Sequence, residues 1–389
     1  MHSDSLSPRV NLEQSRKQAK DLLKAFKAGD PQVLDRIRWN HPRFRGLTDD
    51  HIRKGPFVLA DAQLVIARLH YFENWSGLLR HIETIARQDP RVSRFEDAAD
   101  AIISGDVAKL EILLRAHPDL VTQRSTRAHG APLLHYVAAN GVEDYRQLSP
   151  ANAVDVARVL LNAGAEVDAT SHAYGGGSTA LGLVATSTPP RRAGVQLTLI
   201  DLLLQRGAAL DGVRPGTSYV RDALANGCQE AARALADRGA GLDIVAAAGV
   251  GRVDLVRKLA DVANARELEE ALVTAAGTAG AYDVVEYLLH LGVDVAAGTG
   301  WTALHAATGG ADLRIIDLLI SRGAPLEKRN MYGGSALGQA IWFASHRDPA
   351  DIGDYVRVID MLIAAGARTD AYPQMMEQIE DARRRATSG

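Results

Sequence analysis

The sequence predicts an all-α helical solenoid, preceded by a separate helical segment. The main observation is an apolar helical stretch that ends in Gly-Ala or Gly-Val and has a shorter, Ala-rich helical stretch upstream of it. Glycine ends a helix readily because it reaches the left-handed conformation without a Cβ clash. Two helices per repeated unit are typical of a solenoid. The capping glycines are Gly164, Gly207, Gly239, Gly292, Gly323 and Gly366.

The spacing of these glycines sets the length of the unit. Successive glycines lie 43, 32, 53, 31 and 43 residues apart. The longest interval contains one further unit, residues 244–265, so the basic period is about 32 residues with insertions. We therefore expect about eight units, at 95–125, 127–171, 172–212, 213–243, 244–265, 266–297, 298–329 and 330–372.

The composition narrows the class of protein. Of the 389 residues, 47% are apolar and only 5% aromatic, which suits closely packed helices with small side chains. The net charge of −3 gives no attraction to nucleic acid or acidic membranes, and the single Cys228 allows neither an internal disulfide nor a cysteine zinc site. No secretory signal and no long apolar run are present. We expect a cytoplasmic monomer without a cofactor that binds neither nucleic acid nor membrane.

Two segments carry a resemblance to a known family. "GWTALHAA" at 300–307 and "GAPLLHYVAANG" at 130–141 resemble the turn and first helix of ankyrin repeats, whose pattern is T-P-L-H-x-A. The resemblance covers residues 95–372 but is specific in only three or four units; units 5 and 6 have no room for a finger. It implies short β-hairpin fingers and a concave groove that binds a partner protein.

The remaining chain divides around this array. We expect a flexible N-terminus at 1–10, a helical capping segment at 11–94, and a C-terminal capping helix and tail at 373–389. Residues 28–42 and 104–118 both place Gly-Asp and His-Pro twelve residues apart, which indicates a diverged helix pair before the array. This segment also resembles helical segments that precede ankyrin arrays in many bacterial proteins.

The histidines of the repeat motif invite a chemical interpretation, but a structural one is favoured. Thr302 lies one helical turn before His305, so the two side chains can hydrogen-bond and tie the turn to the helix start. The motif recurs at His135, and no H-x-x-x-H or H-E-x-x-H spacing exists in the chain. A catalytic or metal-binding role for His305 is the alternative.

The exposed positions of each unit describe a groove. Four and five residues after the histidine position, the pairs are small, among them Ala139–Asn140, Gly249–Val250 and Gly309–Gly310. The C-terminal end is aromatic and offers anchors of the kind found at interface hot spots. We expect a binding site formed by Trp301, Arg329, Met331, Tyr332, Trp342 and Phe343.

Three insertions, at 142–153, 188–197 and 345–355, are expected to form one rim of this groove. They and the glycine-rich finger at 173–179 are expected to contribute Tyr145, Arg146, Tyr174, Arg191, Arg192, His346, Arg347, Asp348 and Tyr355.

Two functions from different classes fit this pattern. The first is recognition of an unidentified partner protein through the concave groove, without catalysis. The alternative is a small-molecule-binding protein or enzyme, whose mid-groove pocket is walled by the insertion loops and uses His, Tyr, Arg and Asp as acid–base groups without a metal. An enclosed pocket lined by such groups would favour the alternative, and an open groove with exposed aromatics would favour protein binding.

Overall fold

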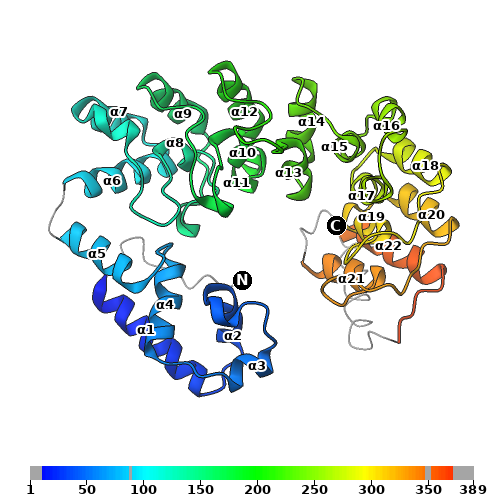
Figure 1. The fold of residues 1–389 in the computed structure, drawn as a ribbon, viewed down its shortest axis with the longest axis horizontal. Coiled ribbons are helices and arrows are strands. Elements are labelled where there is room, and N and C mark those ends of the chain that lie inside the picture. The colour runs from blue at the N-terminus through cyan, green and yellow to red at the C-terminus, as the bar shows by residue number, and fades with distance from the viewer. Residues whose placement is uncertain (1–10, 87–89, 347–351, 371–389) are drawn as a thin grey trace. The chain divides into compact units, whose positions relative to one another are not determined.

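The computed structural model describes residues 11–86, 90–346 and 352–370, and these residues form helices joined by short turns (Figure 1). The predicted all-α solenoid is confirmed. No strand occurs within the described ranges; the fingers contain two isolated antiparallel bridges, Arg124–Pro132 and Ser171–Ser178. No helix in this part of the chain combines the length and hydropathy needed to cross a membrane.

The chain forms two compact units, Met1–Thr217 and Ser218–Gly389. The division falls inside the stretch that the sequence describes as one array, at the turn after the third helix pair of that array. Insertions lengthen two of the three connections within helix pairs before this point, whereas the first four pairs after it have short connections.

The N-terminal segment is a helical bundle with its own core. Helix α1 packs along α4, and α2 packs against both of them. The core between them is apolar and includes Leu22, Ile37, Phe44 and Val65. The helices are α1 (Leu12–Lys27), α2 (Gln32–Asn40), α3 (Asp49–Lys54), α4 (Leu59–Leu69) and α5 (Trp75–Ala86).

The sequence echo in this segment corresponds to a repeated backbone shape. Gly29 and Gly105 both adopt a positive φ, of 77° and 74°, and each turns the chain from one helix into the next. The second helix then ends at a His-Pro, where the proline opens a 3₁₀ helix: η1 (Pro42–Phe44) and η2 (Pro118–Thr122). Proline favours this first position because its missing N–H would have no helical partner there.

Three helix pairs complete the first unit. In Figure 1 the helices α6, α8 and α10 form one row and α7, α9 and α12 the other, as expected for stacked repeats. The short α11 (Thr188–Arg192) lies in an insertion. The pairs are α6 (Pro90–Ser104) with α7 (Val107–Ala116), α8 (Leu133–Tyr136) with α9 (Ala153–Asn162), and α10 (Ala180–Ala185) with α12 (Gln196–Gln205).

The described residues of the second unit form five helix pairs, with odd-numbered helices in the inner row and even-numbered helices in the outer row. Small buried residues such as Ala271, Ala275 and Ala307 let the inner helices approach closely. The pairs are α13 (Tyr219–Ala225) with α14 (Gln229–Asp237), α15 (Ile244–Gly249) with α16 (Val253–Ala260), α17 (Ala265–Ala276) with α18 (Tyr282–His290), α19 (Ala303–Gly310) with α20 (Leu313–Ser321), and α21 (Ala336–His346) with α22 (Ile352–Ala364).

Candidate binding site

The finger that leads into α21 is a tight turn held by Asn330. Its side-chain Oδ1 accepts hydrogen bonds from the backbone N–H groups of Tyr332 and Gly334, both at 3.0 Å. The N–H of Met331 donates to the carbonyl of Gly300 at 2.7 Å, which fastens this finger to the preceding one. The turn therefore presents Met331 and Tyr332 to solvent, with 71% and 81% of their surfaces exposed.

Aromatic side chains from the finger and from α21 face this turn. The rings of Trp301 and Tyr332 lie 6.1 Å apart at an interplanar angle of 88°. Trp342 and Phe343 form a second edge-to-face pair, 5.4 Å apart at 71°. Such arrangements suit the ring quadrupoles. The ring of Phe343 also stacks on the ring of Tyr355, which is buried. Phe343 is therefore packed against the protein interior, whereas Trp342 is half-exposed.

These aromatics enclose a pocket of about 710 Å³. Its volume falls in the range of sites that bind a small molecule or a short peptide stretch. Among the described residues, only Tyr332 in its lining carries a titratable side chain. The lining residues are Trp301, Asn330, Tyr332, Gly333, Gly334, Gly338, Gln339, Trp342 and Phe343.

A second hollow of about 610 Å³ continues along the inner helices, and Trp301 borders both. Its floor includes Gly309 and Gly310, positions expected from the sequence to be small and open. Ala139 and Gly249 are corrections to that expectation, since Ala139 is buried and Gly249 is covered as well. A Cβ at Gly249 would lie 2.3 Å from Leu224 Cδ1, so Gly249 is covered by its neighbours and serves packing instead.

Charges line one side of this second hollow. The Arg221 guanidinium pairs with Asp243 at 2.8 Å and with Glu270 at 2.7 Å. Partial burial raises the pKa of Asp222 above its usual value, and Arg221 opposes this shift. These groups are part-exposed, so the ion pairs contribute little stability but give the hollow a polar wall.

His305 is held as a structural residue. Its Nδ1 lies 2.8 Å from Thr302 Oγ1, and its Nε2 lies 3.3 Å from the carbonyl oxygen of Gly334 in the next finger. His135 makes the corresponding contact, with Nε2 2.8 Å from the carbonyl of Ala169. Each histidine therefore joins an inner helix to the following finger, and burial lowers the pKa of both rings.

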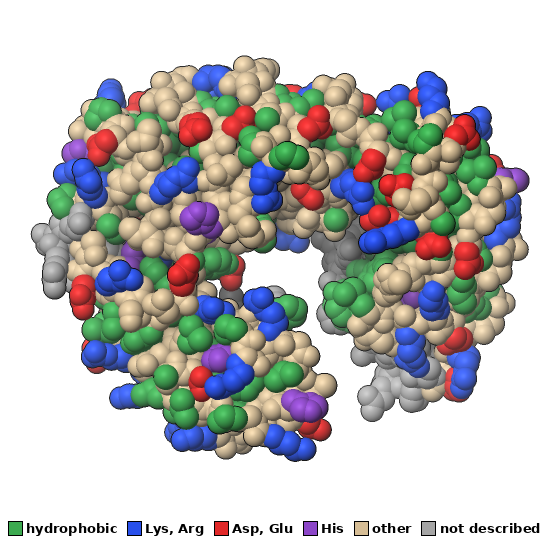
Figure 2. Space-filling model, in the orientation of Figure 1, with side chains coloured by type: hydrophobic (Ala, Val, Ile, Leu, Met, Phe, Trp, Pro, Cys, Tyr) green, Lys and Arg blue, Asp and Glu red, His purple; other side chains and the backbone are tan. Residues whose placement is uncertain are grey.

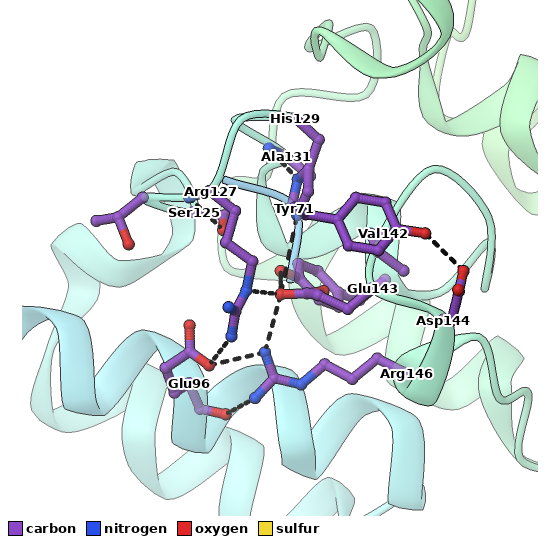
Figure 3. Close-up of polar contacts among 12 residues, drawn as sticks. Tyr71, Glu96, Ser125, Arg127, His129, Ala131, Val142, Glu143, Asp144 and Arg146 are labelled. Atoms are coloured by element: carbon purple, nitrogen blue, oxygen red, sulfur yellow. Dashed lines mark hydrogen bonds and ion pairs between the residues drawn. The ribbon is translucent and has the colours of Figure 1, made fainter. Parts of the chain in front are cut away.

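Three residues expected on the rim lie inside the protein instead. Tyr355 of the third insertion is 4% exposed and donates its hydroxyl to the Gly309 carbonyl at 2.9 Å, and the other two belong to the first insertion. Arg146 is 1% exposed, and Tyr145 is partly buried, with its hydroxyl accepting a hydrogen bond from Arg127 at 3.1 Å. Figure 3 shows the cluster of charged side chains that Arg146 joins. The insertion thus turns back onto α6 because its charges find partners there, and these two side chains do not wall the groove.

The buried cluster pairs two arginines with three carboxylates. Glu143 accepts from both Arg127 and Arg146, and Glu96 Oε2 lies 2.8 Å from Arg127 and 2.9 Å from Arg146. Asp100 completes it, 2.7 Å from Arg146. The two guanidinium groups hold the pKa of Glu143 far below its ordinary range, although burial acts in the opposite direction. A buried charge needs such compensation because desolvation is costly.

This cluster connects the N-terminal helices to the first finger. The N–H of Ala128 donates to the Tyr71 carbonyl at 2.7 Å, and His81 Nδ1 lies 2.8 Å from Thr126 Oγ1. The Arg127 guanidinium lies 5.5 Å from the centre of the Phe72 ring. Sequence reasoning missed Arg127, Glu96 and Glu143, and no local pattern marks them because they come from separate elements.

The other expected rim residues are dispersed. Arg191 and Arg192 are exposed at the end of α11, and Tyr174 is 73% exposed with its hydroxyl donating to Asn140 Oδ1 at 2.5 Å. None of these lines the aromatic pocket. Arg329 does lie at its edge, with Nη1 donating to the Gly333 carbonyl at 2.6 Å. The side chain of His346, and residues Arg347 and Asp348, lie outside the described residues, as does the expected segment 373–389.

The described residues contain no group of three or more His, Cys, Asp or Glu that could hold a metal ion, and Cys228 is buried. Charged side chains of both signs are interspersed over the face shown in Figure 2. The sites that the structure gathers are therefore the aromatic pocket with its adjoining hollow, and the buried ionic cluster.

Comparisons with known proteins found a matching family model and similar solved structures. Residues 272–320 match the family model described as Ankyrin repeats (many copies). The crystal structure of the human ASB11 ankyrin repeat domain is 21% identical, with a TM-score of 0.37, covering 70% of this chain and 98% of that one. A comparison with curated proteins found no match. The family match thus covers residues 272–320 of the second unit, and helix pairs of the same stacked arrangement lie on both sides of this stretch. Repeats of this class generally mediate protein–protein interaction.

Proposed function

We propose that this chain binds a partner protein through the inner face of its second unit, with the aromatic pocket as the main anchor point. The observation that carries the proposal is the convergence of Trp301, Tyr332 and Trp342 on one 710 Å³ pocket. Tryptophan and tyrosine dominate interface energies because they bury a large area at a low entropic cost. The adjoining hollow extends the contact surface along the small floor residues.

The chemistry of the lining supports binding over catalysis. An acid–base site needs convergent titratable groups, and among the described lining residues of the pocket only Tyr332 is one. In the adjoining hollow, Arg221 is already paired with Asp243 and Glu270. The rim groups that the catalytic alternative requires are partly turned inward, as Tyr145 and Arg146 are.

Affinity capture from a host-cell lysate tests the proposal with a matched control. Wild type and Trp39→Ala are compared with the double variant Trp301→Ala/Trp342→Ala. Trp39 is 71% exposed on α2 in the other compact unit, so its removal tests for general loss of surface tryptophan. We expect a partner that is retained by the first two proteins and lost from the double variant. A partner retained equally by all three would place the binding surface elsewhere.

A further inference from the structure

The finger that leads into α21 carries two exposed cations, Lys328 and Arg329. Arg329 Nη1 donates to the carbonyl of Gly333, a lining residue of the aromatic pocket, at 2.6 Å, and Lys328 Nζ donates to the Ala296 carbonyl at 2.6 Å. Among the described residues neither cation has a carboxylate partner. A carbonyl oxygen brings only a partial charge, so the finger keeps a net positive charge beside the pocket.

The acid next to these cations in the chain is engaged elsewhere. Glu327 Oε1 accepts a hydrogen bond from the backbone N–H of Arg368 at 2.7 Å. Burial lowers the pKa of His305, and the positive charge of Lys328 adds to this shift. Because His305 Nε2 lies 3.3 Å from the carbonyl oxygen of Gly334 in the pocket lining, the Lys328 charge acts close to the pocket as well.

The sign of the charge changes between the two hollows of the groove. Among its described lining residues the aromatic pocket has no Asp, Glu, Lys or Arg, so the finger cations dominate there. The adjoining hollow instead sets one arginine, Arg221, against two carboxylates, Asp222 and Glu270. Charge complementarity across an interface fixes the register of a partner and excludes partners of the wrong charge.

We propose that the aromatic pocket takes an acidic segment of the partner protein, in which an apolar side chain enters the pocket and an adjacent Asp or Glu pairs with Arg329. This rests on the proposed function, because it names the chemistry of the segment that the same pocket binds. The bond to Gly333 uses one of the three guanidinium nitrogens of Arg329, and Nε and Nη2 have no partner among the described residues. A guanidinium matches a carboxylate well because it donates charge-assisted hydrogen bonds in a planar fork.

A basic segment is the competing occupant, because aromatic faces by themselves attract a cation. A Lys or Arg at this pocket would meet the charges of Lys328 and Arg329 with no acid in the described lining to offset the repulsion. The hollow restricts the acidic segment in turn, since Asp222 and Glu270 would repel a carboxylate placed there. The acid should therefore lie on one side of the apolar anchor only.

Peptide selection on the full chain tests this inference. A phage-displayed library of random twelve-residue peptides is selected on wild type and counter-selected on Trp301→Ala/Trp342→Ala, after circular dichroism has shown both to be folded. We expect the enriched peptides to share an apolar or aromatic residue with Asp or Glu on one side of it. Tryptophan-dependent peptides without a shared acid, or with Lys or Arg in its place, would overturn the acidic class and leave protein binding at the pocket intact. Failure to enrich any tryptophan-dependent peptide would contradict both proposals.

A charge exchange tests the role of Arg329. Fluorescence anisotropy with the selected peptide should show about a 2- to 5-fold weaker affinity for Arg329→Gln, as is typical of a partly exposed ion pair. Arg322→Gln removes the same charge from an exposed position at the end of α20 and should bind as wild type does. Arg329→Glu should prefer a peptide whose acid is replaced by Lys, which reverses the order seen with wild type and which a misfolded finger would not produce. The wild-type order retained in Arg329→Glu would overturn the pairing with Arg329.

Discussion

The rings of Trp301 and Tyr332 stand almost perpendicular, with centroids 6.1 Å apart, although the residues belong to consecutive fingers of the array. The backbone bond from Met331 to Gly300 holds the two fingers together, and Asn330 fixes the turn that carries Tyr332. The pair is therefore set in place before a partner arrives. Such preorganisation reduces the entropic cost of binding.

Removal of the Tyr332 ring should weaken binding without affecting the fold. Tyr332 is 81% exposed in the free protein, so Tyr332→Ala should change the free energy of unfolding by less than about 0.5 kcal/mol. As an interface anchor it should cost about 2 kcal/mol of binding free energy, or roughly 30-fold in affinity. Isothermal titration of the captured partner measures this loss. An affinity equal to that of wild type would remove Tyr332 from the site.

Loss of Glu143 should destabilise the first unit strongly. Glu143→Ala leaves Arg127 and Arg146 short of a buried partner, which costs about 3–5 kcal/mol. The control is Asp254→Ala, because Asp254 pairs with Arg252 at the surface, where solvent screening leaves an ion pair with little effect on stability. Urea midpoints followed by circular dichroism compare the two variants. Equal shifts would show that the buried cluster does not stabilise the fold.

Acid should destabilise the protein before its carboxylates are protonated. Burial lowers the pKa of His70, His81 and His135 to about 4, so these rings are neutral in the folded protein and take up protons on unfolding below pH about 6.5. Stability is thus complete above pH 6.5 and falls as the pH decreases toward 4, by at most about 1.4 kcal/mol per unit for each ring.

Urea midpoints between pH 7 and 4.5 measure this slope. His81→Gln should make it shallower, because it removes one of the buried rings that take up a proton on unfolding. A slope that is the same in wild type and His81→Gln would rule out the contribution of that ring.

Two glycines of the inner helices should respond oppositely to alanine. At Gly249 an added Cβ would lie 2.3 Å from Leu224 Cδ1 and 2.8 Å from Thr274 Cγ2, so Gly249→Ala should cost about 1–3 kcal/mol. At Gly309 the nearest atom is 3.5 Å away, and Gly309→Ala should be neutral or stabilising by up to about 1 kcal/mol. Thermal melts compare them; a larger loss for Gly309→Ala would contradict this assignment of packing and floor roles.

Much of the architecture is local and was predictable from the sequence. Capping glycines such as Gly323 and the Thr302–His305 motif fix helix ends within a few residues, so the helix pairs follow from short-range patterns. The exposed positions of the pocket aromatics could also be predicted from the sequence. Counting from the histidine of the repeat motif places Trp301 and Trp342 on the exposed face of their units.

The inward turn of the first insertion was not predictable in the same way. An arginine in a polar loop, such as Arg146, is usually solvated. Only the fold brings Arg146 to Glu96, which lies fifty positions earlier in the chain. The prediction for Gly249 was wrong for a related reason. A glycine in an inner helix indicates either open space or close packing, and the contact with Leu224 shows that it is close packing. Contacts between distant elements are what the local pattern does not contain.

Amide hydrogen exchange of the full chain, with and without the captured partner, tests most directly whether the partner binds at the aromatic pocket. Binding there should slow exchange in the two fingers, residues 298–302 and 328–334, and in the exposed amides of α21. The N-terminal helices α1–α3 should exchange as they do in the free protein. Protection confined to α1–α3, with both fingers unchanged, would contradict the assignment of the binding surface.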